Sequence, residues 1–146
     1  MLLFHSSCND QGVAEDPHGL DQEELLRLVE HSLPISSFDA SKLSAAGVSL
    51  LTSTEEGLTR RNSMHCRVKS DVFIPAGGRP NTINRDNWRD FLDENNVPSS
   101  KLIVEGANIF ITPEARQKLY ETAKVAIVKD SSANKVSTAC LCMIDG

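Results

Sequence analysis

Three short runs of apolar residues, separated by segments with helical patterning, constrain the fold of this chain more than any other feature of its sequence. The runs are Val72–Ile74, Leu102–Val104 and Val125–Val128. Continuous apolar runs of this length are typical of strands buried on both faces of a parallel sheet, and the helices between them supply the crossover connections. The sequence therefore predicts an α/β fold, with a parallel sheet and flanking helices.

Capping residues and apolar faces predict the two helices between these runs. One helix begins at Thr112, whose hydroxyl can accept a hydrogen bond from the first turn, and has Pro113 as its first residue. The other is capped by Asn84 and turns Trp88 and Phe91 toward the sheet. Both helices are expected to bury one face against the strands.

The first half of the chain is patterned less clearly. Leu2–Phe4 is predicted as a short strand, and the polar residues 6–12 that follow it are predicted as a turn. A helix begins after Asp21, with Leu25, Leu28 and Val29 in one apolar stripe at helical spacing, and ends before Pro34. Residues 36–70 show no single period and are predicted as a long irregular connection.

Charge and apolar content exclude two classes of partner. The 146 residues carry 15 Lys+Arg against 20 Asp+Glu, a net charge of −5, and they contain no basic cluster that would bind nucleic acid. No apolar run approaches the roughly 18 to 20 residues of a membrane span. We therefore expect a soluble protein with no nucleic-acid or membrane partner. No secretory signal is recognisable, so the expected location is cytoplasmic or mitochondrial.

The cysteines and histidines do not form a metal-binding pattern. The four cysteines lack the CxxC spacing of zinc and redox sites, and they are too sparse for a disulfide scaffold. The four histidines are not paired with cysteine or acidic residues at ligand spacing. The sequence predicts free thiols in a reducing compartment and no metal site.

Ligands of open α/β sheets bind at the carboxyl ends of the strands, so the loops that follow the apolar runs are the candidate sites. These loops are Ala76–Arg79, Glu105–Asn108 and Lys129–Lys135. Asn9 or Asp10, directly after the expected first strand, lies where a dinucleotide site places a ribose-reading side chain. Each has a structural alternative: a tight turn for the glycine loop, a capping role for Asn108, a solvated third loop, and an Asx turn at Asn9.

Sequence motifs that bind phosphate or carry out hydrolysis are absent. The chain has no GxGxxG, P-loop, GxSxG or HExxH motif. Without a phosphate-cradling loop, the chain is expected to hold at most half of a dinucleotide site.

The candidate loops and their order resemble the nucleotide-binding domain of the large NAD-specific glutamate dehydrogenases. Three segments carry this resemblance: Asp71–Pro80, Ile103–Thr112 and Lys129–Lys135. Two more, Asn9–Val13 and Asp16–Leu20, resemble the segment after the second strand of that domain. The combination is far more specific than any single loop.

The resemblance implies the domain and its cofactor, NAD. Residues 1–138 form a partial NAD-binding, Rossmann-like domain, and residues 139–146 form a divergent tail. Relative to the family pattern, the sheet lacks its first strand and Gly-rich loop. The implied activity converts L-glutamate, NAD and water to 2-oxoglutarate, ammonium and NADH.

The resemblance also assigns roles to the loops. The glycine loop runs beside the ribose and pyrophosphate of NAD, the asparagine of the second loop contacts the nicotinamide ribose or carboxamide, and that of the third faces the interdomain cleft. The implied cofactor-binding residues are Asn9, Ala76, Gly77, Gly78, Asn108 and Asn134. No residue of the chain is assigned as catalytic.

Glutamate and 2-oxoglutarate would bind through a substrate domain that this chain lacks, and the full-length enzyme is expected to be a homo-oligomer. The chain is accordingly expected to be a fragment that is inactive alone. A second hypothesis is a non-catalytic half-Rossmann module that acts by associating with another subunit through an exposed sheet edge.

Overall fold

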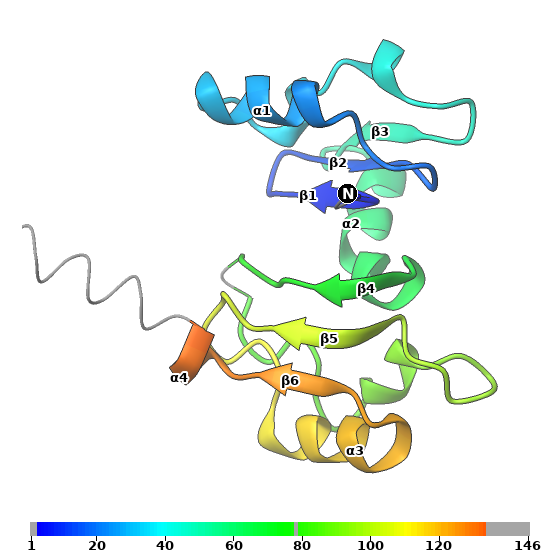
Figure 1. Ribbon diagram of the computed structural model, residues 1–146, viewed down its shortest axis with the longest axis vertical. Helices are drawn as coiled ribbons and strands as arrows, with labels where there is room; N and C mark the ends of the chain where they lie inside the picture. Colours follow the sequence, from blue (N-terminus) through cyan, green and yellow to red (C-terminus); the bar gives the residue numbers. More distant parts are fainter. Residues whose placement is uncertain (1–2, 78, 134–146) are drawn as a thin grey trace, which may run out of the picture. The chain divides into compact units, whose positions relative to one another are not determined.

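The computed structural model describes residues 3–77 and 79–133 of the chain. The chain divides into two units, Met1–Val68 and Lys69–Gly146, and each has its own three-stranded sheet (Figure 1). The predicted extent of a single domain, residues 1–138, stays a prediction. The predicted tail, residues 139–146, lies outside the described residues.

The second unit contains the predicted parallel sheet. Its strands are β4 (Ser70–Phe73), β5 (Ser100–Val104) and β6 (Ala126–Val128), in the spatial order β4-β5-β6. Both neighbouring pairs are parallel, and Ile103 in the central strand lies opposite Ile127. The predicted α/β class, with a parallel sheet and flanking helices, is thus confirmed.

The helix after β5 begins where its sequence predicts. Helix α3 (Pro113–Ala123) is capped by Thr112, whose hydroxyl accepts a hydrogen bond from the amide of Ala115. It ends at Lys124, which adopts the left-handed conformation common at helix ends. Sequence and structure agree here because a local capping pattern fixes both ends of the helix.

The predicted helix capped by Asn84 is wrong in type. Only a short 3-10 helix, η3 (Trp88–Phe91), forms, and its cap is Asn87. Asn84 instead accepts a hydrogen bond from the amide of Asp86, while its own amide donates to the side chain of Asn87. These local side-chain bonds compete with an α-helical turn. Trp88 and Phe91 are nevertheless buried, as predicted.

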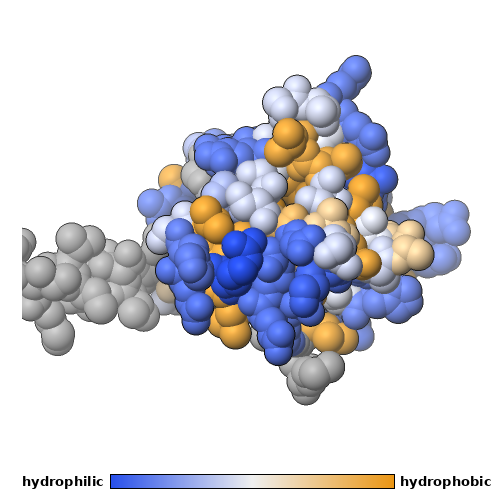
Figure 2. All heavy atoms as spheres, turned by 90° about the horizontal axis from the view of Figure 1, so that it is seen from above, coloured by the Kyte–Doolittle hydropathy of each residue, from blue (hydrophilic) through white to orange (hydrophobic). Residues whose placement is uncertain are grey.

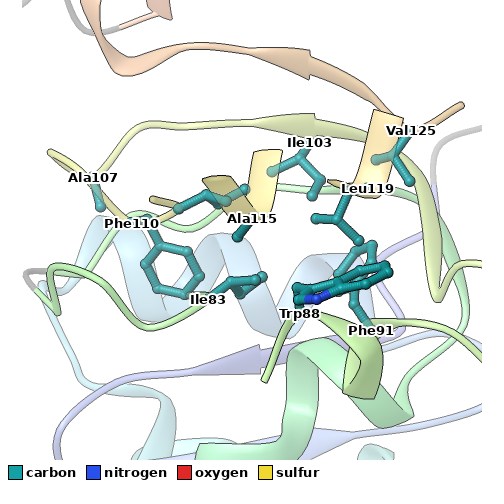
Figure 3. Packing of buried hydrophobic residues seen from close by; sticks show 10 residues of the cluster. Ile83, Trp88, Phe91, Ile103, Ala107, Phe110, Ala115, Leu119 and Val125 are labelled. Carbon is teal, nitrogen blue, oxygen red and sulfur yellow. The ribbon is translucent and has the colours of Figure 1, made fainter. Parts of the chain in front are cut away.

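A single apolar cluster joins the sheet, α3 and η3 of the second unit (Figure 3). Ile103, Ala115 and Leu119 have no exposed surface, and Phe73 packs edge-on against Phe110 with 5.7 Å between ring centroids. The buried members of the cluster are Ile83, Trp88, Phe91, Ile103, Ala107, Phe110, Ile111, Ala115, Leu119 and Val125. This core fixes the carboxyl edge of the sheet, where the candidate loops begin.

The first unit contains an antiparallel sheet that the sequence did not predict. Strand β2 (Gly12–Glu15) lies between β1 (Ser6–Cys8) and β3 (Val48–Leu51). The predicted strand at Leu2–Phe4 is therefore wrong, although Leu2 itself lies outside the described residues. The turn predicted over residues 6–12 forms only between the two strands, because Ser6–Cys8 is β1 and Gly12 begins β2. The polar edge strand β1 has no apolar run because its residues are only half-buried.

Helix α1 (Gln22–Glu30) has the predicted cap, because the Asp21 carboxylate accepts a hydrogen bond of 2.8 Å from the amide of Glu24. Leu28 is buried, but Val29, predicted to share the same inner face, is 75% exposed. Figure 2, which is turned by 90° from the view of Figure 1, shows hydrophobic and hydrophilic residues intermixed on this face. The buried cluster of this unit consists of Ala14, Leu20, Leu28, Ile35 and Phe38.

The predicted irregular connection over residues 36–70 is also wrong. It contains β3, the helix α2 (Glu55–Arg67) and a short 3-10 helix, η2 (Ala40–Lys42), and it begins inside another, η1 (Ile35–Ser37). Helix α2 buries only Gly57 and Met64, so it has no apolar stripe that a sequence pattern could reveal. No helix among the described residues is long and apolar enough to cross a membrane.

Candidate functional site

The loops after β4 and β5 lie side by side at the carboxyl edge of the parallel sheet. The amide of Ala107 donates a 2.7 Å hydrogen bond to the carbonyl of Pro75. A Cβ atom added to Gly106 would lie 3.3 Å from the same carbonyl, so glycine permits this close approach. Ala76 and Asn108, two of the predicted site residues, are thereby brought together, and both are exposed.

Gly77 leaves its backbone open to a ligand. It is exposed, and a Cβ atom added there would meet no atom within 4 Å. Packing against the described residues therefore does not require glycine at this position. An uncovered backbone at the end of a parallel strand fits a nucleotide that approaches closely. Gly78, the next predicted residue, lies outside the described residues.

A buried carboxylate anchors the second loop. Glu105 has no exposed surface, and its Oε1 accepts a 2.9 Å hydrogen bond from the amide of Ile111. Its Oε2 accepts a 2.9 Å bond from Nη2 of Arg116, on the first turns of α3. The sequence interpretation treated Glu105 only as part of a turn. The available signal was a charged residue placed directly after an apolar strand.

Asp130 ties the third loop to the second. It opens the short helix α4 (Asp130–Ala133), and its Oδ2 accepts a 2.9 Å hydrogen bond from the amide of Ile109. The bonds from the amides of Ile109 and Ser131, with the nearby charges of Arg116 and Lys129, lower the pKa of the Asp130 carboxyl. The three loops thus form a connected edge. Asn134 lies outside the described residues.

Asn9 belongs to the first unit, whereas the three loops belong to the second. Its side-chain oxygen accepts hydrogen bonds of 2.9 and 3.0 Å from the amides of Gln11 and Gly12. These bonds close the turn between the antiparallel strands β1 and β2, which is the Asx turn that the sequence left open as an alternative. A role for Asn9 in binding ribose stays a prediction.

Neither a metal site nor a deep pocket coincides with the loop edge in the part of the chain that the structure describes. The described residues contain no group of three or more His, Cys, Asp or Glu side chains that could hold a metal ion. An open hollow of about 370 Å³ lies between α3 and β6, and none of Ala76, Gly77 and Asn108 lines it. Its lining residues are Pro113, Arg116, Gln117, Tyr120, Val125, Ile127 and Lys129. The loop edge, rather than this hollow, holds the predicted site residues.

The parallel sheet with its flanking helices defines an α/β protein, and in open sheets of this class ligands bind at the carboxyl edge of the strands, where these loops lie. Comparison with known families makes this class specific. Residues 5–141 match the model of the Glutamate/Leucine/Phenylalanine/Valine dehydrogenase family, and the chain belongs to that family.

Individual relatives agree with the family. The chain is 44% identical over 135 residues to the probable NAD-specific glutamate dehydrogenase of Schizosaccharomyces pombe, with 85% of this chain and 12% of the relative covered. It is 40% identical over 141 residues to the NAD-specific glutamate dehydrogenase of Saccharomyces cerevisiae, with 85% and 13% covered. The chain therefore spans only a small part of the length of these curated relatives.

Solved structures of glutamate dehydrogenases share the fold. The chain matches the glutamate dehydrogenase of Plasmodium falciparum with a TM-score of 0.59 and 18% sequence identity. The match covers 90% of this chain and 25% of the solved one. At this level of identity, the likeness supports the fold alone.

Proposed function

We propose that this chain forms one wall of the cofactor site in an NAD-specific glutamate dehydrogenase. Such an enzyme converts L-glutamate, NAD and water to 2-oxoglutarate, ammonium and NADH. The names of the relatives support the activity and the cofactor. The observation that carries the proposal is the gathering of exposed Ala76, Gly77 and Asn108 at the carboxyl edge of the parallel sheet.

In this proposal, each loop residue binds or orients the cofactor. The open backbone at Ala76 and Gly77 lies against the ribose and pyrophosphate. The Asn108 amide, which has both donor and acceptor atoms, orients the nicotinamide half. When bound, NAD supplies the acceptor for the hydride that leaves glutamate. The chain's own contribution is binding and orientation.

The proton chemistry and the substrate contacts are assigned to parts of the polypeptide beyond this chain. None of the residues at the loop edge is proposed as a general acid or base. Glutamate binding and assembly into a homo-oligomer likewise belong to the whole enzyme, because this chain corresponds to only 12–13% of the length of the two yeast relatives. Alone, the chain is expected to show negligible hydride transfer.

The unpaired sheet edges favour the alternative of a non-catalytic association module. Within the described residues, β4 and β6 each pair only with β5, so the outer edges of both strands have backbone groups without strand partners. Such edges promote association. A discrete oligomer of the isolated chain that shows no saturable NADH fluorescence would favour this alternative.

A chimeric enzyme tests the proposed function. The aligned residues of this chain would replace the matching segment of the Schizosaccharomyces pombe relative, and glutamate-dependent formation of NADH would be measured. We expect an active chimera with a KM for NAD close to that of the native relative. Replacing Asn108 by Ala should raise this KM by roughly 2- to 10-fold, the effect of losing one neutral hydrogen bond.

The isolated chain and the native relative are the controls. The native relative must be active under the same conditions, and the isolated chain should not reduce NAD. A soluble chimera that elutes like the native relative but forms no NADH would contradict the proposal. So would glutamate-dependent reduction of NAD by the isolated chain, because no proton-transfer group has been assigned to it.

A further inference from the structure

The second loop contains a strained residue that its own side chain does not hold in place. Ile109 has a φ of 53°, in the left-handed region that β-branched residues rarely adopt. Its side chain is 54% exposed, so burial does not explain the conformation. Strained residues persist only where the surrounding structure fixes them, and they are concentrated at functional sites. Contacts of the Ile109 backbone must therefore hold this conformation.

Both backbone polar groups of Ile109 are bound by other loops. Its amide donates to Oδ2 of Asp130 at 2.9 Å, and its carbonyl accepts a 2.7 Å hydrogen bond from the amide of Asn81. Asp130 also accepts a 2.6 Å bond from the amide of Ser131, which fixes the carboxylate at the start of α4. Hydrogen bonds at both its amide and its carbonyl thus hold the strained residue in place.

A second carboxylate holds the far end of the same loop. Glu105 accepts from the amide of Ile111, and Nη2 of Arg116 donates both to Glu105 and, at 3.1 Å, to the carbonyl of Ile111. The guanidinium is 19% exposed and the carboxylate is fully buried. A buried carboxylate is stable only with such partners, so this pair enforces one loop geometry.

We propose that Asp130 and Glu105 are positioning residues, which hold the loop Gly106–Ile109 so that Asn108 presents its amide to the cofactor. This inference rests on the proposed function. Asp130 gives the sharper test, because it reaches the loop from a different strand end and is only partly buried. Neither carboxylate is proposed to touch NAD.

The test compares three variants of the chimeric enzyme. Asp130→Ala removes the acceptor for the Ile109 amide, so we expect the KM for NAD to rise on the order of tenfold, the loss expected for a hydrogen bond to a charged group. The KM for glutamate should change much less. Asp130→Asn keeps one acceptor oxygen and should restore most of the affinity. Asp90→Ala removes an exposed aspartate of η3, outside the loop edge, and serves as the matched control.

Hydrogen exchange gives a second readout that does not depend on turnover. Asp130→Ala should speed exchange at the amide of Ile109, and Asp90→Ala should not. If kcat falls and the KM values for NAD and for glutamate both rise, to the same extent in Asp130→Ala and Asp130→Asn, the role is merely structural and the inference is overturned. An unchanged KM for NAD in Asp130→Ala overturns it as well. Failure of the proposed function is distinguishable, because the unmutated chimera would then already be inactive.

Discussion

Buried carboxylates bind segments of this chain that lie apart in the sequence. Four acidic side chains are buried among the described residues: Glu15, Asp16, Glu24 and Glu105. Each accepts hydrogen bonds from an arginine or from backbone amides of a distant segment. Because these buried oxygens need partners in fixed positions, the local structure depends on the carboxylate side chains themselves.

We predict that the contacts of Glu24 in the first unit are sensitive to acid. Its carboxylate binds the guanidinium of Arg27 and the amide of Asp39, and these hydrogen bonds, that of Arg27 first, lower its pKa from 4.5 to about 2. A lowered folded pKa means that the stabilisation is present above the unfolded pKa and is lost as the pH falls from about 5 toward 2. Glu24→Gln should lower the urea midpoint at neutral pH and reduce its fall on acidification.

The neighbouring residue provides the control for this prediction. Glu23 is exposed, so Glu23→Gln should leave both the midpoint and its pH dependence close to those of the unmodified chain. Comparing the two variants separates Glu24 from the other carboxylates that titrate over the same range. Equal acid sensitivity in Glu24→Gln and in the unmodified chain would contradict the assignment.

Among the elements, the ones that the sequence predicted are those with local signals. Helix α1 and helix α3 have recognisable caps, and β5 contains a short apolar run. Helix α2 escaped prediction because it is held by charge: Arg67 binds the Glu15 carboxylate of β2 at 2.8 Å, and Arg60 binds the same carboxylate at 3.3 Å. A sequence pattern contains no information on partners 45 and 52 residues away.

The same reasoning explains how much of the candidate site was predictable. Ala76, Gly77 and Asn108 follow strands, and parallel strands place their carboxyl ends at one edge, so their proximity follows from the fold class. The roles of Glu105 and Asp130 depend on hydrogen bonds to particular amides. Those bonds are visible only once the loop paths are known.

The first turn of α2 gives a prediction at the scale of an element. Replacing a helical glycine by alanine usually stabilises a helix, but a Cβ atom at Gly57 would lie 2.1 Å from the carbonyl oxygen of Leu51. Gly57→Ala should therefore destabilise the protein by about 1–3 kcal/mol through overpacking. Thr59→Ala, at an exposed position of the same helix, should instead be neutral or slightly stabilising. Urea denaturation of both variants tests this prediction. A Gly57→Ala variant more stable than the unmodified chain would contradict the expected clash with the carbonyl oxygen of Leu51.

At the scale of the molecule, the chain divides into two units, each with a buried cluster of its own. The cluster of the first unit lies among β2, α1 and η1, and that of the second joins β5, α3 and η3. Stability that resides in separate clusters can be lost separately. The candidate cofactor loops all begin in the second unit. The stability of that unit alone should therefore determine whether these loops keep a fixed structure.

A core substitution in the second unit tests this separation. Leu119 is fully buried within α3, and Leu119→Ala should cost about 2–5 kcal/mol through lost contacts and the cavity left behind. Amide hydrogen exchange should then speed up at Ile103 and through the cofactor loops, while the amide of Ala14 in β2 keeps its protection. If protection at Ala14 falls by the same factor, the two units unfold as one. In that case the structure of the cofactor loops would depend on the stability of the antiparallel sheet as well.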